Sequence, residues 1–394
     1  MKLLRSLSGF YGIVGPNLPI SSISSLYSLF TGNGIIQGVF IENGTITPVQ
    51  HILQTEKIKY PWLDTSCIST LPFYLGLHTL HLFPNPIGVA NTAFLHLPNK
   101  DYVLFERDLP YQIHIKNKQI NTIERKRIPG VTHLSGHSKF IRNKVYSLEY
   151  SIVKKSVTLL TLSSHLQLMK RQEIKTKYIP LVHDFVRLQD STLFSDSPIR
   201  ISLKALVKGQ FPIIMDTKPT FIHHVTDQKV TTFQSKSSFF IFHYAKLVET
   251  EKSFEVYAPL YYQLNFSTIH IHGIYSKLLL DKQTRQITIQ TTPELKRYNL
   301  DFPIVWKEYI ILRNIENGKI NGFVFCKELM IRKTLFLLLS ICGEPSVVND
   351  KLLCIGYDTY FNAYFIVIDL EDNSMEQMNL NWTATLGFHS IFIN

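Results

Sequence analysis

The sequence has few cysteines and no segment that could serve as a membrane span. Its 394 residues include Cys67, Cys326, Cys342 and Cys354, with no C-x-x-C pair among them. This spacing excludes a disulfide framework and indicates reduced thiols in a cytosolic protein. No apolar run reaches the ~18–20 residues that a membrane-spanning helix needs. The basic-then-apolar start lacks a small-residue cleavage site, which argues against a signal peptide.

Acidic residues are also in short supply. The chain has 41 Lys and Arg against 30 Asp and Glu, which gives a net charge of +11. Such a balance suits an anionic membrane surface or nucleic acid, but scattered surface lysines explain it better, because the Lys and Arg residues cluster only weakly. The densest cluster, residues 124–127 (ERKR), is too short and too mixed in sign for a groove-binding arm. We therefore predict no nucleic-acid partner.

Helical periodicity and linkers are scarce, whereas strand-like runs recur throughout. Residues 166–176 are the most helix-like stretch, and no Gly/Ser/Pro-rich linker divides the chain. Asn43-Gly44 and Asn317-Gly318 each stand between alternating apolar residues, which predicts hairpins. Residues 278–290 and 364–380 show the same strand–turn–strand pattern. We predict one all-β domain over 1–394, for which composition does not choose between a propeller and a sandwich.

Four of the fifteen histidines have distinctive surroundings. His137 lies in a Gly-containing turn (HLSGHSKF), and His389 lies near the end (TLGFHSIFIN). His183, with Asp184 beside it, and His243 are expected inside apolar strands, YIPLVHDFVRL and SSFFIFHYAKLVE. Imidazoles from separate strands can meet only if those strands converge on one axis, as the inner strands of propeller blades do.

Seven segments carry a resemblance to a known family, in that family's order. They are GFYGIVGPN (9–17), LFTGNGIIQGVFIENG (29–44), ILQTEKIKY (52–60), SGHSKF (135–140), VHDF (182–185), FIFHYAKLVE (240–249) and GFHSIF (387–392). The sequence thus resembles the carotenoid cleavage oxygenases, which include apocarotenoid- and stilbene-cleaving dioxygenases and the vertebrate retinoid isomerohydrolase. The resemblance implies a seven-bladed β-propeller with a metal site on its central axis.

The resemblance also implies a site. One Fe(II) ion per chain would be held by the four histidines at the motif positions, His137, His183, His243 and His389. Three acids at motif positions would orient the imidazoles as outer partners, namely Glu106, Asp301 and Glu344.

Some features compete with this assignment or depart from it. The tandem pair His223-His224 is an alternative to His243, although no acid follows either of them by six residues, as Glu249 follows His243. The chain also departs from the family pattern at three positions: Lys246 replaces Asn, Asp301 replaces Glu and Ser390 replaces Gly.

The implied activity is an oxidative cleavage of a conjugated double bond, with O₂, into two carbonyl products. The substrate would be an apolar polyene or a stilbene-like alkene. Two alternatives stay open: a retinoid isomerohydrolase with the same iron, and a degenerate propeller that only binds apolar ligands. The expected location is cytoplasmic with peripheral membrane contact. The apolar segment 71–89 (LPFYLGLHTLHLFPNPIGV) suits such contact, and equally a buried core segment.

Overall fold

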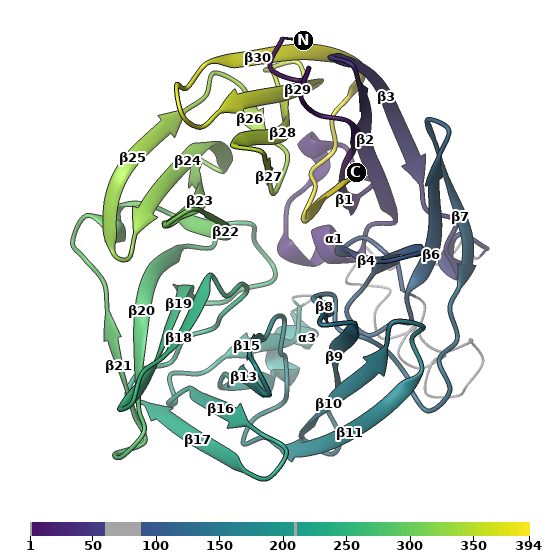
Figure 1. Cartoon of the computed structure of the whole chain (residues 1–394). Coiled ribbons are helices and arrows are strands. Elements are labelled where there is room, and N and C mark those ends of the chain that lie inside the picture. Colours follow the sequence, from purple (N-terminus) through teal and green to yellow (C-terminus); the bar gives the residue numbers. More distant parts are fainter. Residues whose placement is uncertain (1, 60–87, 209–210) are drawn as a thin grey trace. The chain divides into compact units, whose positions relative to one another are not determined.

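The computed structural model describes residues 2–59, 88–208 and 211–394, and almost all of its regular structure is strand (Figure 1). The α-helical turns are α1 (Leu26–Thr31) and α3 (Leu203–Val207). Short 3₁₀ turns lie at η1 (Ile20–Ser22), η2 (Glu56–Lys59) and η4 (Leu295–Arg297). Among the described residues no helix has the length and apolarity to cross a bilayer.

The first sheet joins strands from opposite ends of the sequence. Its order is β3 (Thr45–Ile52), β2 (Gly34–Glu42), β1 (Gly9–Pro16) and β31 (Ser390–Ile393). β31 pairs antiparallel with β1, with Phe10 opposite Ile393 and Ile13 opposite Ser390, so the two strands lie side by side in Figure 1. This pairing fixes the backbone that directly follows His389.

Two further sheets follow in chain order. One contains β4 (Ala93–Leu97), β5 (Lys100–Leu104), β6 (Tyr111–Lys116) and β7 (Gln119–Arg125). The other contains β8 (Lys139–Ile141), β9 (Lys144–Ser151), β10 (Ser156–Ser163) and β11 (Leu168–Lys175). Residues 166–176, the most helix-like stretch of the sequence, lie mostly in β11. Most of its side chains are exposed or half-buried, and their burial alternates only weakly. A strand of this kind lacks the apolar alternation that would distinguish it from a polar helix in sequence.

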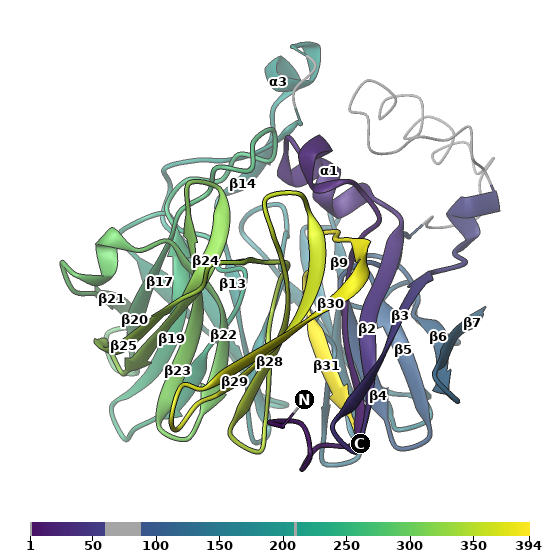
Figure 2. The same cartoon turned by 90° about the horizontal axis from the view of Figure 1, so that it is seen from above.

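An eight-stranded sheet contains two antiparallel halves. One half is β12 (Val186–Leu188), β13 (Ser191–Asp196), β16 (Phe221–Val225) and β17 (Val230–Ser235). The other is β18 (Lys246–Glu249), β19 (Ser253–Tyr261), β20 (Gly273–Asp281) and β21 (Gln286–Gln290). A short parallel pairing joins β17 to β21. The small β14 (Ile199–Ile201) and β15 (Ile213–Met215) hairpin carries α3, which projects from it in Figure 2.

The last two sheets complete the described strands. One contains β22 (Leu300–Trp306), β23 (Tyr309–Glu316), β24 (Lys319–Lys327) and β25 (Met330–Phe336). The other contains β26 (Ser340–Ile341), β27 (Ser346–Val348), β28 (Lys351–Tyr357), β29 (Asn362–Asp369) and β30 (Met375–Thr383). With the two halves of the eight-stranded sheet, these and the three earlier sheets make seven antiparallel groups among the described residues, besides the β14–β15 hairpin. The all-β prediction is confirmed.

The hairpins form where turn chemistry predicts them. Asn43 and Gly44 adopt φ of 51° and 78° between β2 and β3. Asn317 and Gly318 adopt φ of 51° and 75° between β23 and β24. Both central positions need the left-handed region in this turn, and Asn and Gly enter it at low cost. The chain therefore encodes the register of these two hairpins locally.

The described residues divide into two compact units. One contains the described residues of 1–149 together with 160–170 and 338–394, and the other contains residues 150–159 and the described residues of 171–337. In the first unit, Tyr11, Val39, Ile355 and Phe365 belong to one buried apolar cluster. In the second, buried side chains of β13, β16, β17, β19 and β20 form another cluster. The expectation of a single domain over 1–394 stays a prediction.

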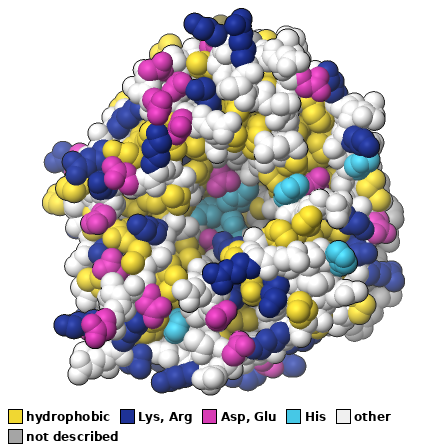
Figure 3. Space-filling model, viewed as in Figure 1, with side chains coloured by type: hydrophobic (Ala, Val, Ile, Leu, Met, Phe, Trp, Pro, Cys, Tyr) yellow, Lys and Arg dark blue, Asp and Glu magenta, His cyan; other side chains and the backbone are white. Residues whose placement is uncertain are grey.

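Charged side chains are dispersed over the face drawn in Figure 3, where Lys and Arg alternate with Asp and Glu. Ion pairs on the sheets follow the same pattern, as between Lys282 and Glu249 or Lys327 and Glu308. The excess of basic residues is therefore spread among acidic neighbours on this face.

Candidate metal centre

Each of the four predicted histidines lies just before a strand at the edge of its sheet. His137 lies in a turn two residues before β8, and His389 directly precedes β31. His183 and His243 each lie three residues before a strand, β12 and β18. The expectation that His183 and His243 lie inside strands is therefore wrong.

The residues before His243 are buried without forming a continuous strand pairing. Phe239, Phe240, Ile241 and Phe242 are all buried, with exposed fractions from 0% to 5%. A strand with one polar side would expose every second residue. This segment is instead buried on both sides, and its backbone pairs with β19 at the Phe240–Tyr261 bridge before β18 begins at Lys246.

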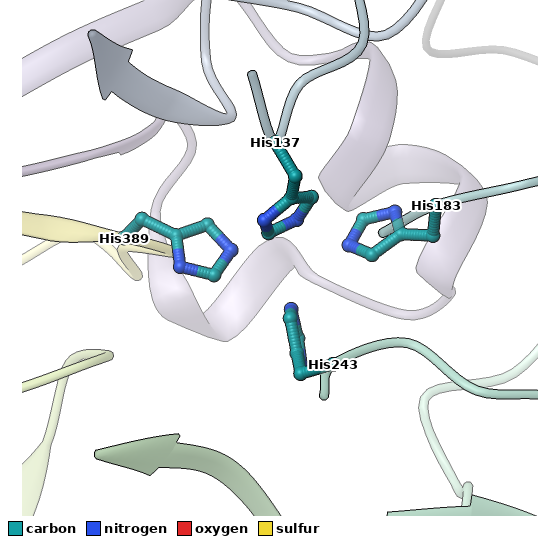
Figure 4. Close-up of side chains that lie close together, drawn as sticks. All are labelled: His137, His183, His243 and His389. Carbon is teal, nitrogen blue, oxygen red and sulfur yellow. The ribbon is translucent and has the colours of Figure 1, made fainter. Parts of the chain in front are cut away.

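The four imidazoles lie close together. The His137 and His389 rings are 4.5 Å apart between centroids, and the His183 and His243 rings are 5.2 Å apart. One ligand nitrogen from each of the four histidines lies within 4.8 Å of the others, and the rings point toward one another in Figure 4. Three of the rings are buried and His137 is partly exposed.

A carboxylate holds His243 from behind. Asp301, the second residue of β22, lies 2.8 Å from His243 Nδ1 and is 4% exposed. Burial acts to raise the pKa of Asp301, but the His243 ring and the Arg313 guanidinium outweigh it and lower the pKa to about 2. The ionised carboxylate accepts the Nδ1 proton, so Nε2 is the nitrogen that His243 can offer to a metal.

An irregularity in β22 accompanies this contact. The register between β22 and β23 shifts between Asp301 and Ile304, and Phe302 adopts a φ of 53°. The Phe302 and His243 ring centroids are 4.3 Å apart. The Arg313 guanidinium lies over the Phe302 ring, 3.3 Å from its centroid. A non-glycine residue in the left-handed region is costly and persists only where its surroundings impose it. The bulge thus places a carboxylate and an aromatic ring against the same imidazole.

A second carboxylate holds His389. Glu344 Oε2 lies 3.2 Å from His389 Nδ1 and accepts the backbone N–H of Ser390 at 3.1 Å. The Ser390 hydroxyl, which replaces the family's glycine, lies 2.8 Å from the Ser346 hydroxyl. The Tyr11 hydroxyl donates to the Glu344 carbonyl at 3.4 Å. Burial raises the pKa of Tyr11 well above its ordinary value, so this hydroxyl keeps its proton.

The third predicted acid, Glu106, lies beside the turn that carries His137. A Cβ placed on Gly136 would lie 3.2 Å from Glu106 Cγ and 2.7 Å from Thr92 Cγ2. Only glycine fits at this position without displacing a neighbour. Glu106 is therefore packed against the residue that precedes His137.

The competing histidines are engaged elsewhere. His223 lies in β16, where Nδ1 is 2.9 Å from the Thr232 hydroxyl and Nε2 is 3.4 Å from Asp196. The His224 ring lies 4.4 Å from that of Phe254, and burial lowers its pKa. Neither ring lies in the four-histidine cluster.

Other motif residues point away from the cluster. Lys246 begins β18 and is exposed. Glu249, six residues after His243, is exposed and pairs with Lys282 at 2.7 Å. By contrast, sequence analysis assigns no role to Asp184, whose carboxylate accepts backbone N–H groups of Phe185 at 2.7 Å and Tyr244 at 3.1 Å. Its position directly after His183 was the only local indication.

The donor set fits a divalent transition metal. Imidazole nitrogen suits iron, zinc, copper and nickel, and carboxylates bonded to the far ring nitrogens fix the tautomer and angle of ligating imidazoles. His243 and His389 both show that arrangement. The four-histidine cluster therefore fits a metal site, and its donor atoms alone do not choose the ion.

Comparison with known proteins identifies relatives over most of the chain. The family model described as "Retinal pigment epithelial membrane protein" matches residues 5–361. Carotenoid 9,10(9',10')-cleavage dioxygenase 1 of Arabidopsis thaliana is 25% identical over 279 residues, which cover 63% of this chain and 51% of that protein. The carotenoid 9,10(9',10')-cleavage dioxygenase of Crocus sativus is 23% identical over 52% of this chain and 41% of its own length. The match thus spans about half the length of these relatives.

Solved structures resemble the chain over nearly its whole length. Lignostilbene dioxygenase of Pseudomonas brassicacearum gives a TM-score of 0.78 at 14% identity, covering 99% of this chain and 92% of that one. Cobalt-substituted apocarotenoid oxygenase of Synechocystis gives 0.75 at 15% identity, covering 98% and 92%. These likenesses confirm the predicted fold class, an all-β seven-bladed propeller.

Proposed function

Because the chain belongs to the retinal pigment epithelial membrane protein family, we propose that it is an iron-dependent dioxygenase. Its substrate is a carotenoid, an apocarotenoid or a stilbene-like alkene, which it cleaves at a conjugated double bond. The names of the relatives, carotenoid-cleaving and lignostilbene dioxygenases, support this substrate range. The activity yields two carbonyl products.

One observation carries the proposal: four histidine nitrogens lie within 4.8 Å of one another. Asp301 and Glu344 bind the far nitrogens of two of these rings, as outer partners of metal-ligating histidines do. Four neutral ligands leave the full charge of a divalent ion in place. When bound, Fe(II) supplies a redox-active centre with positions open to small molecules.

The reaction balances without an external reductant. Both bonds of the carbon–carbon double bond break, and each carbon becomes a carbonyl carrying one atom of the same O₂. The electrons that reduce O₂ come from the double bond itself. The residues of the chain need only hold the ion, place the alkene and exclude water.

Aromatic side chains beside the imidazoles suit an apolar, conjugated substrate. Phe302 lies 4.3 Å from the His243 ring, and Phe242 lies 5.2 Å from the His183 ring, measured between centroids. Phe388, the neighbour of His389, stacks on a phenylalanine of α1 at 5.6 Å. Apolar walls with few polar groups are typical of sites for such ligands.

We also propose peripheral membrane contact by a cytoplasmic protein. Of the segment 71–89, on which that expectation first rested, residues 71–87 lie outside the described residues. Within them, Leu203 and Val207 of α3 are 73% and 88% exposed. Lys204 and Lys208 adjoin them in sequence, and apolar side chains beside basic ones suit an anionic lipid surface.

The test is reconstitution under anaerobic conditions followed by product analysis. Purified protein is loaded with Fe(II), its iron content is measured, and carotenoids, apocarotenals and stilbenes are supplied with ¹⁸O₂. The expected result is one iron per chain and ¹⁸O in both carbonyl products. Water-derived oxygen without chain scission would indicate an isomerohydrolase instead. A protein that retains no iron would indicate a module that binds apolar ligands.

A further inference from the structure

Asp184 forms a bridge between two of the histidine-bearing segments. One of its carboxylate oxygens, Oδ1, accepts the N–H of Phe185 at 2.7 Å. The other, Oδ2, accepts the N–H of Tyr244 at 3.1 Å. Tyr244 directly follows His243, and Asp184 itself directly follows His183. The two ligand segments are therefore joined through one buried side chain, which is 3% exposed.

Both segments lack a strand ladder at the histidine itself. The β12 pairing begins at Val186 and the β18 pairing begins at Lys246, each three residues after a histidine. In the segment before β18, Phe240 is bridged to Tyr261, and Ala245 donates to the Tyr257 carbonyl at 2.8 Å. Between these two anchors, the Tyr244 N–H reaches Asp184 instead.

A ring contact joins the same two segments, from the residue before His243 to His183 itself. Phe242, which precedes His243, meets the His183 ring edge to face at 5.2 Å and 82°. The His183 and His243 rings are themselves 5.2 Å apart at 76°. The hydrogen bond and the ring contact thus fix the distance and the angle between two of the four imidazoles.

We propose that Asp184 is a positioning residue that sets the spacing of His183 and His243 before the metal binds. This inference rests on the proposed metal centre and adds a role that acts through neither ring nitrogen. A carboxylate that accepts two backbone N–H groups holds them more strongly than a neutral acceptor does. A ligand pair that is already correctly spaced binds a metal with less reorganisation.

The test uses Asp184→Asn, which keeps the size of the side chain but offers one acceptor oxygen in place of two. Its matched control is Asp196→Asn. Asp196 is 2% exposed and also accepts two backbone N–H groups, from Lys177 at 2.6 Å and Tyr178 at 3.3 Å. It lies in β13 and contacts none of the four clustered histidines by a described hydrogen bond.

Metal affinity is measured by anaerobic Co(II) titration, which reports binding through the cobalt absorption bands and needs no turnover. We expect the dissociation constant of Asp184→Asn to rise about 5–10-fold with altered bands, the size expected when a charge-assisted hydrogen bond becomes a neutral one, and that of Asp196→Asn to stay within about threefold. Unfolding of the metal-free proteins by urea measures the general loss of stability, which both variants should share. Unchanged affinity and bands in Asp184→Asn, or equal weakening in Asp196→Asn, would overturn the inference.

A measurement on the wild-type protein covers the case in which Asp184→Asn does not fold. The amides of Phe185 and Tyr244 should exchange slowly with D₂O in the metal-free protein, because the bridge forms without metal. Exchange at the rate of an exposed amide would overturn the inference. Wild-type protein that binds neither Co(II) nor Fe(II) would refute the metal centre as well, so the two failures are distinguishable.

Discussion

Replacing Asp301 by Asn tests whether the carboxylate behind His243 strengthens metal binding. Asn keeps the shape and an oxygen acceptor at 2.8 Å from Nδ1 but removes the negative charge. A charge-assisted hydrogen bond contributes about 1.5–3 kcal/mol and a neutral one about 0.5–1.5 kcal/mol. The loss of about 1–1.5 kcal/mol corresponds to metal binding that is roughly 5–10-fold weaker. The buried Arg313 also loses its opposite charge, so the metal-free protein should be less stable.

The assay is competition for Co(II) against a chelator of known affinity, under anaerobic conditions. Glu249→Gln is the control, since Glu249 belongs to the same motif but is exposed and pairs with Lys282. It should bind Co(II) as the wild type does. The reasoning is refuted if Asp301→Asn also binds as tightly as the wild type, or if both variants weaken binding equally.

Three further outcomes are expected. His243→Ala should abolish iron retention and scission, whereas His223→Ala should spare both, because His223 already contacts two other polar side chains; equal iron content by metal analysis would contradict this. Gly136→Ala places a Cβ 2.7 Å from Thr92 Cγ2, so it should cost about 1–3 kcal/mol of unfolding free energy and weaken Co(II) binding; a variant with wild-type urea midpoint and affinity would argue against that contact. Burial lowers the pKa of His133 from 6.5 to about 4. As pH falls from 6.5 toward 4, the unfolded state therefore takes up a proton that the folded state does not, and the free energy of unfolding decreases. Between pH 7 and pH 5 the wild type should lose about 2 kcal/mol more than His133→Asn in urea unfolding, and parallel curves would contradict this.

Local chemistry made the hairpins predictable. Asn43-Gly44 and Asn317-Gly318 supply the positive φ that each turn requires, so two residues specify the connection. The positions at which strands begin near the histidines do not follow from such local chemistry. Phe239–Phe242 pack on all sides, and nothing in their sequence distinguishes that environment from a half-buried strand.

The four clustered histidines were identified through motif resemblance, and the structure places them together. Their metal-binding role stays a prediction. The contacts of Asp184 and Arg313 were not foreseen, because the first joins residues 60 apart and the second depends on the bulge in β22. Asp184 meets Tyr244, and Arg313 covers a ring in the neighbouring strand of its sheet. Periodicity and spacing carry no information about such pairs.

The pairing of β31 with β1 has a consequence for how the protein folds. His389 immediately precedes β31, and its carbonyl accepts the N–H of Val14 from β1. We expect contacts between such distant segments to form late in folding, because the chain loses the entropy of closing a long loop before these contacts can stabilise it. An ion that needs His389 would therefore bind tightly only after β31 has paired with β1, and its binding would in turn stabilise that pairing against unfolding. Metal binding would then stabilise the paired ends of the chain, and the rate of metal uptake during refolding would report the last step of folding.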